Sequence, residues 1–134
     1  MSEMLLNVEN LRVGFDTPAG FLRAVDGISF QMQRGEVLGL VGESGCGKTV
    51  TALALLRLLP RPPAVIEGGR ALFRGQDLLA MPIAELRRIR GGRIGMIFQE
   101  PMTALSPLHR IGDQLVEAAR LHKEISVAEA RALA

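Results

Sequence analysis

The stretch from Gly42 to Thr49 constrains the fold of this chain more than any other part of its sequence. It reads GESGCGKT and fits the pattern G-x-x-x-x-G-K-[ST]. Glycines permit backbone angles that a Cβ atom would forbid, so successive N–H groups can converge on phosphate oxygens. Lys48 adds a compact positive charge, and Thr49 adds a hydroxyl group for Mg²⁺ at the start of a helix whose dipole favours an anion. The pattern predicts a loop that binds the phosphates of a nucleotide.

The residues on both sides of this loop support the prediction. Val37 to Val41 is a continuous apolar run, typical of a strand buried on both faces of a parallel sheet. Thr49 to Leu59 places apolar residues at helical spacing and is followed by prolines that end a helix. A second apolar run, Ile94 to Phe98, predicts another buried strand. Gln99 at its end can coordinate Mg²⁺ or orient water, or it is an ordinary polar residue that closes the strand.

The remaining segments predict a sheet at the start of the chain and helices at its end. Three apolar-rich segments separated by turn residues indicate a small antiparallel sheet: Met4–Val8, Leu11–Phe15 and Leu22–Phe30. Ala71 to Arg74 resembles a short strand, Pro82 to Ile89 a short helix, and the residues from Ile111 an amphipathic helix. Ser126, with Glu129 three residues later, predicts a capping box at the start of a last helix.

The composition limits the core and the partners. Hydrophobic residues make up 48% of the chain, but it has five Phe and no Trp or Tyr, so we expect an aliphatic core. The net charge of +2 and the lack of interleaved aromatic residues argue against a nucleic-acid partner. An Arg-rich stretch, residues 57–93, is either a solvated surface or a positive zone near a nucleotide or anionic lipid headgroups.

The single cysteine, Cys46, excludes an internal disulfide and suits a reducing compartment. Its place in the loop fits either a small residue at a variable position or a reactive thiol. The sequence shows no signal-peptide pattern and no apolar run long enough to cross a bilayer, so we expect a cytosolic chain.

Several segments, in this order, resemble the ATP-binding subunits of ABC transporters: Leu11–Phe15, Ala24–Phe30, Gly35–Thr49 and Met96–Leu105. The last two look most like the dipeptide, oligopeptide and nickel importer branch. The resemblance implies an α/β fold with an incomplete P-loop NTPase (ABC ATPase) core. Residues 1–134 would be the N-terminal part of a single nucleotide-binding domain. About 1–36 would form an antiparallel β region, 37–99 the core from the P-loop to the Q-loop, and 100–134 the start of the helical subdomain.

The resemblance also implies the cofactors ATP and Mg²⁺ and a role for each site residue. Gln99 would be the Q-loop glutamine that senses the γ-phosphate, and Thr49 and Gln99 would bind Mg²⁺. Phe15 would stack on adenine, with Phe21 as a competitor. The loop residues that would bind the phosphates are Gly42, Glu43, Ser44, Gly45, Cys46, Gly47, Lys48 and Thr49.

The implied partners are membrane permease subunits, which would bind the region Gln99 to Leu108, and a second ATP-binding subunit. Ser106 departs from the Asn that is usual in this branch. The protein would lie at the cytoplasmic face of the inner membrane as the transport-coupled ATPase of an importer of di- or oligopeptides or a related solute such as nickel. The sequence does not identify the solute.

Some family features are absent from these residues. There is no LSGGQ-like motif, no later strand that ends in an Asp-Glu pair, and no switch histidine, since His109 and His122 are interpreted as surface residues. We therefore expect no catalytic residue and negligible ATP hydrolysis in this chain alone. We also expect aggregation through the unpaired edge of the strand Val37–Val41. Two alternatives remain: a non-ABC P-loop kinase or GTPase, and a fragment that binds nucleotide without turnover.

Overall fold

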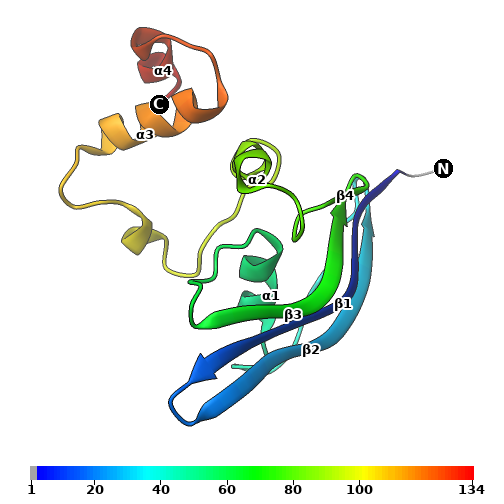
Figure 1. Ribbon diagram of the computed structural model, residues 1–134. Helices are drawn as coiled ribbons and strands as arrows, with labels where there is room; N and C mark the ends of the chain where they lie inside the picture. The colour runs from blue at the N-terminus through cyan, green and yellow to red at the C-terminus, as the bar shows by residue number, and fades with distance from the viewer. Residues whose placement is uncertain (1–2) are drawn as a thin grey trace. The chain divides into compact units, whose positions relative to one another are not determined.

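The computed structural model describes residues 3–134 and divides the chain into two compact units. The first unit runs to Leu86 and the second from Arg87 to Ala134, so the division falls inside α2. The elements, all but η1 labelled in Figure 1, follow in this order: β1 (Met4–Thr17), β2 (Gly20–Gln33), α1 (Lys48–Leu55), β3 (Ala64–Phe73), β4 (Gln76–Asp77), α2 (Ile83–Ile89), η1 (Pro101–Ala104), α3 (Ile111–His122) and α4 (Val127–Leu133).

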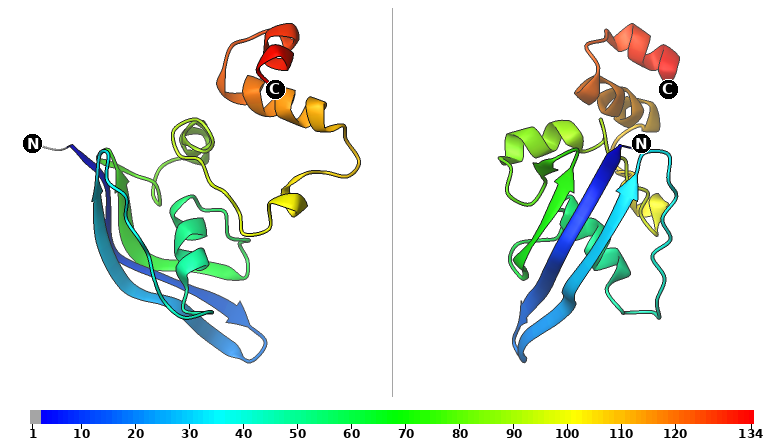
Figure 2. Two further views of the ribbon diagram at one scale, coloured as in Figure 1. Left: turned by 180° about the vertical axis from the view of Figure 1, so that it is seen from behind. Right: turned by 90° about the vertical axis from the view of Figure 1, so that its right-hand side faces the viewer.

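A four-stranded antiparallel sheet dominates the first unit, with its strands in the order β2-β1-β3-β4. β1 and β2 form a long hairpin in which Thr17 pairs with Gly20. β3 returns along the other edge of β1 and pairs Phe73 with Leu6. The sheet curves strongly, and α1 lies on its concave side (Figure 2). The predicted antiparallel sheet is confirmed, and it includes a third long strand, β3, of which the sequence indicated only the end.

A bulge near Asn10 interrupts the pairing of β1 with both of its neighbours. Asn10 has a φ of 48°, and its N–H donates to Ser29 Oγ at 2.8 Å. Gly69 of β3 lies against this bulge with a φ of +98°, and a Cβ atom there would lie 2.6 Å from the carbonyl oxygen of Asn10. Glycine at this position therefore allows β3 to approach the bulge.

The core of the first unit is mainly aliphatic, as the composition predicts. Val8, Leu11 and Val13 of β1 are at most 1% exposed. Burying a Val or Leu side chain fully stabilises a fold by roughly 1.5–3 kcal/mol, so β1 is the main anchor of the sheet. Further buried residues come from β2, β3, α1, α2 and the residues that follow α1 and β4: Val25, Ala54, Leu56, Ala64, Ala71, Phe73, Leu78 and Leu86.

Helix α1 ends earlier than the sequence predicts. The apolar spacing continues to Leu59, but the helix stops at Leu55 and Arg57 adopts a left-handed φ of 52°. The N–H of Arg57 donates to Ala54 O at 2.9 Å, and its guanidinium donates to Met81 O at 2.7 Å. This distant acceptor gives a physical reason for the early end, because it fixes the Arg57 side chain away from the helix axis.

The second unit contains η1, α3 and α4. α3 packs on α4 and buries Val116 and Ala130. The capping box at the start of α4 is confirmed: Ser126 N donates to the Glu129 carboxylate at 2.8 Å, and Glu129 N donates to Ser126 Oγ at 3.2 Å. These bonds satisfy donors that the first turn of a helix leaves without partners.

The two predicted buried strands do not form, so this part of the sequence interpretation is wrong for the chain. Residues 37–41 and 95–98 have no strand structure, and Val37, Val41 and Ile97 are 96%, 91% and 93% exposed. A strand needs a neighbouring strand to pair its backbone groups. Over residues 3–134, the pairing of either run is limited to an isolated bridge between Arg90 and Ile94. In the same part of the chain, no helix is both long and apolar enough to cross a membrane.

Candidate nucleotide-binding site

The loop Gly42–Thr49 bends sharply just before α1. Gly45 and Gly47 have left-handed φ angles of 81° and 95°, which cost little only for glycine. A Cβ atom at Gly47 would lie 2.6 Å from the backbone oxygen of Ala24 in β2, so this glycine also allows close packing on the sheet. A Cβ atom at Gly42 would collide with Cys46 Sγ. Gly47, which the motif fixes, therefore needs glycine for both its backbone angle and its packing, whereas Gly45 needs it for the backbone angle alone.

Lys48 points back into this loop. Its Nζ donates to Gly42 O at 2.5 Å and to Glu43 O at 2.7 Å, and it lies 3.5 Å from Cys46 Sγ. The ammonium group is thus held at the centre of the loop by two carbonyl oxygens. A phosphate oxygen can replace such neutral acceptors because its negative charge attracts the ammonium group in addition to accepting its hydrogen bonds.

The start of α1 supplies further donors. The first N–H groups of any helix lack partners within it, and here they belong to Lys48 and the exposed Thr49. Thr51 is buried, and its hydroxyl donates to Gly47 O at 2.8 Å, which fixes the loop to the first turn. A cavity of about 200 Å³ opens beside the loop, lined among others by Asp26, Lys48 and Thr51. The N–H donors at the start of α1, the Lys48 ammonium group and the Thr49 hydroxyl fit the phosphates of a nucleotide with Mg²⁺.

The two candidate aromatic residues lie next to the turn that joins β1 to β2. Phe15 on β1 pairs with Leu22 and is half-buried. Phe21 on β2 is 46% exposed, and its ring covers Gly14 so closely that a Cβ atom at Gly14 would collide with it. The Phe21 ring thus covers the backbone of β1 at Gly14, and both Phe15 and Phe21 stay candidates for stacking on a purine.

Gln99 lies in the other unit from the phosphate loop. It is exposed and follows the apolar run that remains unpaired. The region Gln99–Leu108 contains η1 and exposes several apolar side chains, with Met102 82% and Leu108 88% exposed.

Gln114 of α3 holds the end of this region in place, which the sequence analysis missed. Its Oε1 accepts from Ser106 N at 2.8 Å, and its Nε2 donates to Ser106 O at 2.9 Å and His109 O at 3.0 Å. Ser106 Oγ also lies 3.0 Å from His109 Nδ1, so His109 has a partner although it is exposed. A glutamine on a helix gives no sequence signal of such a role, because the loop it contacts is irregular.

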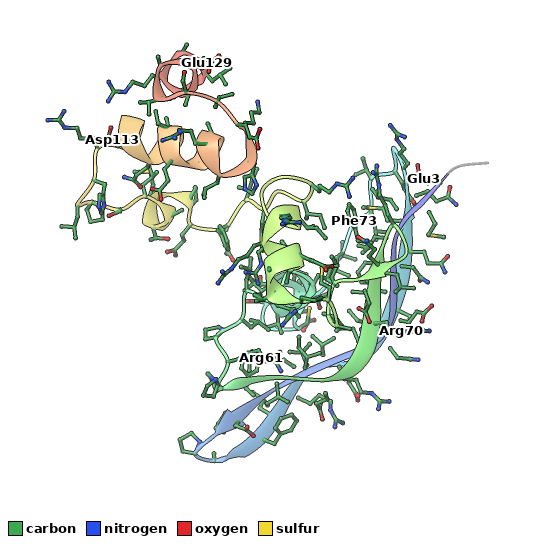
Figure 3. All side chains as sticks on the ribbon, turned by 45° about the horizontal axis from the view of Figure 1, so that its top comes forward. Glu3, Arg61, Arg70, Phe73, Asp113 and Glu129 are labelled. Carbon is green, nitrogen blue, oxygen red and sulfur yellow. The ribbon has the colours of Figure 1, made fainter. Side chains whose placement is uncertain are left out.

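The Arg-rich stretch is partly paired. Arg70 donates to Glu9 at 2.7 Å, and the Arg74 guanidinium lies 5.9 Å from the centre of the Phe73 ring; Figure 3 labels Arg70 and Phe73 on β3. Arg23 of β2 donates two hydrogen bonds to Glu67 of β3, and these bonds hold the pKa of Glu67 below its ordinary value. Most of the charge that the sequence places on the sheet thus lies on a solvated surface and forms ion pairs there.

Comparison with known proteins gives one family match. The family model described as "ABC transporter" matches residues 25–133. A probable peptide ABC transporter ATP-binding protein of Sinorhizobium fredii is 48% identical over 129 residues, which is 96% of this chain and 38% of the relative. The dipeptide transport ATP-binding protein DppD of Bacillus subtilis and the oligopeptide transport ATP-binding protein OppD of Escherichia coli are each 49% identical over the same shares. The chain thus spans 38% of the length of these relatives.

Solved structures support the fold. A bacterial ABC transporter cassette, solved as a dimer, superposes with a TM-score of 0.80 at 19% identity, covering 96% of this chain and 53% of that one. The same cassette in a post-hydrolysis state with ADP and Pi gives the same score, identity and coverage. The predicted fold class, an incomplete α/β ABC ATPase core with an N-terminal antiparallel β subdomain, is therefore confirmed.

Proposed function

Because the chain belongs to the ABC transporter family, we propose that it is the N-terminal part of the ATP-binding, energy-coupling subunit of an importer of di- or oligopeptides. The observation that carries this proposal is the loop Gly42–Thr49, whose glycines turn left-handed and whose lysine lies at the loop centre. The names of relatives at 48–49% identity, which describe peptide, dipeptide and oligopeptide transport, support the solute class.

The proposed chemistry assigns ATP to the loop and Mg²⁺ to two side chains. Backbone N–H groups of the loop and of the start of α1 bind the β- and γ-phosphates, and Lys48 adds its charge there. The Thr49 hydroxyl and the Gln99 amide hold Mg²⁺, which when bound neutralises phosphate charge. Phe15 stacks on adenine. Turnover belongs to the complete subunit, since positioning the nucleophile and metal dominates phosphoryl transfer, whereas the chain of 134 residues binds nucleotide.

The proposed organisation follows the same family. Residues 1–36 form the antiparallel region, 37–99 the core from the P-loop to the Q-loop, and 100–134 the start of the helical subdomain. The exposed apolar side chains of Gln99–Leu108 provide the surface for a membrane permease subunit. A second ATP-binding subunit completes the site, and the assembly lies at the cytoplasmic face of the membrane.

Equilibrium binding of Mg-ATP to this chain tests the proposal, together with a phosphate-release assay. Removing the lysine in Lys48→Ala deletes charge-assisted hydrogen bonds worth about 1.5–3 kcal/mol, so we expect roughly 10- to 100-fold weaker binding. The matched control Arg61→Ala, which removes an exposed cation from the same unit, should bind as the parent chain does. Equal binding by the parent chain and Lys48→Ala would show that the loop Gly42–Thr49 is not the nucleotide site. Steady phosphate release by the chain that disappears in Lys48→Ala would contradict the assignment of turnover to the complete subunit.

A further inference from the structure

A basic pocket in the second unit lies where the C-terminal ends of α2 and α3 meet. Its volume is about 790 Å³, and it takes in Arg87 and Arg88 from α2 and Arg120 from α3. The residues directly after the two helices, Arg90 and Lys123, also line it, and Glu124 is the one carboxylate among the lining residues. The proposed nucleotide loop lies in the first unit and uses none of these residues.

The basic side chains of this pocket differ from those on the sheet in their partners. Within residues 3–134, the side chains of Arg87, Arg88 and Lys123 have neither an ion pair nor a hydrogen bond. Arg120 makes only a long hydrogen bond from Nε to Ile125 O at 3.3 Å. Like charges gathered without counter-charges repel one another, and such a cluster is stabilised when an anion binds.

Helix dipoles do not account for all of this positive charge. Basic residues are favourable near a helix C-terminus, and both α2 and α3 end at the pocket. Each helix end is equivalent to about half a negative charge, so two ends offset roughly one cation. With Glu124 offsetting another, about two of the four charges of Arg87, Arg88, Arg120 and Lys123 remain, with Arg90 left out of the count. The surplus is what a ligand would neutralise.

The pocket is held in shape by close packing between its two sides. Gly91 and Gly92 follow Arg90, and the ring of His122 lies against both of them. A Cβ atom would lie 2.7 Å from His122 Nε2 if added at Gly91, and 3.2 Å from His122 Nδ1 if added at Gly92. Gly91 also has a left-handed φ of +75°. The absence of side chains here lets the ends of the two helices approach, which brings their arginines to one pocket.

We propose that this pocket binds a ligand that carries two or more phosphate groups. Guanidinium groups bind phosphate oxygens through paired hydrogen bonds, and arginine is the main cation of the pocket. The volume lies within the range of about 300–1,000 Å³ that is usual for small organic ligands and is larger than one phosphate needs. The lining contains no Phe, and its one aromatic ring, that of His122, packs against Gly91 and Gly92, so the recognition is of the phosphates themselves.

Pyrophosphate binding to the Lys48→Ala chain tests the proposal, because that background weakens the phosphate loop. We expect binding by calorimetry, and at least a tenfold loss when Arg87→Gln and Arg88→Gln are added. The matched control carries Arg93→Gln and Arg110→Gln, which remove the same charge from exposed positions of the same unit outside the pocket. The control should keep the binding. Lys123→Gln is a second pocket variant, and unchanged far-UV circular dichroism verifies that each variant folds.

The source of the phosphates is distinguished by a sedimentation arm. Vesicles that contain cardiolipin, whose headgroup carries two phosphates, are spun with the same chains, with phosphatidylcholine vesicles as the blank. Pyrophosphate binding without sedimentation assigns the pocket to a soluble ligand. Sedimentation that pyrophosphate competes away, and that the Arg87→Gln, Arg88→Gln pair abolishes, assigns it to a lipid headgroup. Binding of neither probe, or equal losses in the pocket variant and the control, would overturn the proposal. Both results are independent of whether the parent chain binds ATP.

Discussion

Arg23 on β2 donates two hydrogen bonds across β1 to Glu67 on β3. The Arg23 Nε lies 2.8 Å from Glu67 Oε2, and the Arg23 Nη2 lies 2.9 Å from Glu67 Oε1. Gly14 of β1 pairs with Arg23 and has no side chain of its own, and the Phe21 ring covers it. The hydrogen bonds from Arg23 lower the pKa of Glu67, and Glu67 in turn raises the pKa of Arg23. The two strands on either side of β1, namely β2 and β3, are thus joined directly by side chains as well as through their pairing with β1.

Replacing this carboxylate, in Glu67→Gln, should lower the urea midpoint of unfolding slightly at pH 7, since the pair is partly solvated. The folded pKa lies below the ordinary value of 4.5, so the stabilisation is present above pH 4.5 and is lost as the pH falls through the folded pKa. The difference between Glu67→Gln and the parent chain should therefore shrink in acid. Asp16→Asn, an exposed carboxylate on β1, is the control. A difference that persisted unchanged in acid would exclude the charge as its cause.

The two left-handed glycines of the phosphate loop should respond differently to a methyl group. Gly45→Ala meets no atom within 4 Å and should cost only the backbone strain, about 1–2 kcal/mol. Gly47→Ala carries the same strain and also brings its Cβ to 2.6 Å from Ala24 O, so it should be clearly less stable than Gly45→Ala. Thermal unfolding of both variants gives the comparison. Equal losses would mean that the loop moves away from β2 freely.

Deleting the side-chain amide in Gln114→Ala should release the backbone of residues 106–109. Three hydrogen bonds disappear, and each contributes about 0.5–1.5 kcal/mol net. Amide hydrogen exchange at Ser106 N should become faster, while exchange within α4 stays as it was. Glu117→Ala, an exposed position on the same helix, should leave both rates unchanged. Continued protection of the Ser106 amide in Gln114→Ala would rule out this role.

Removing the cap hydroxyl in Ser126→Ala should destabilise α4 by about 1 kcal/mol. Glu129 also has its pKa lowered by hydrogen bonds from the Ser126 backbone and then from its side chain, so the capping box weakens as the pH falls through that lowered value. Amide exchange across α4 measures both effects. Faster exchange that appears only in α3 would contradict the assignment.

The exposed apolar runs should make the chain self-associate. Val37→Lys with Ile97→Lys removes two nearly fully exposed side chains and should lower light scattering in concentrated solution. The control, Ala80→Lys with Ala118→Lys, adds the same charge at exposed alanines and should scatter as the parent chain does. Equal improvement in both would attribute solubility to charge rather than to those side chains.

Local signals in the sequence predicted most of this architecture. The hairpin, the start of α1, the short helix after Pro82 and the capping box of Ser126 each depend on neighbouring residues, and all are confirmed. The predictions of buried strands at Val37–Val41 and Ile94–Phe98 were wrong, because a buried strand depends on a neighbouring strand that apolar character alone cannot supply. Gln114 and the left-handed Arg57 were missed because their partners lie elsewhere in the chain. The roles of Phe15, Thr49 and Gln99 stay predictions until a nucleotide is bound.

The position of β1 between β2 and β3 also sets an order of events during folding. β1 and β2 adjoin in sequence, so their hairpin closes a short loop and can form as soon as Gln33 is available. β3 reaches β1 only after residues 34–63, which include the phosphate loop, have been spanned. Both ends of that segment are fixed only when β3 has paired. A growing chain would therefore contain the complete glycine-rich motif before β3 has paired with β1 and fixed the second end of the segment that carries the motif.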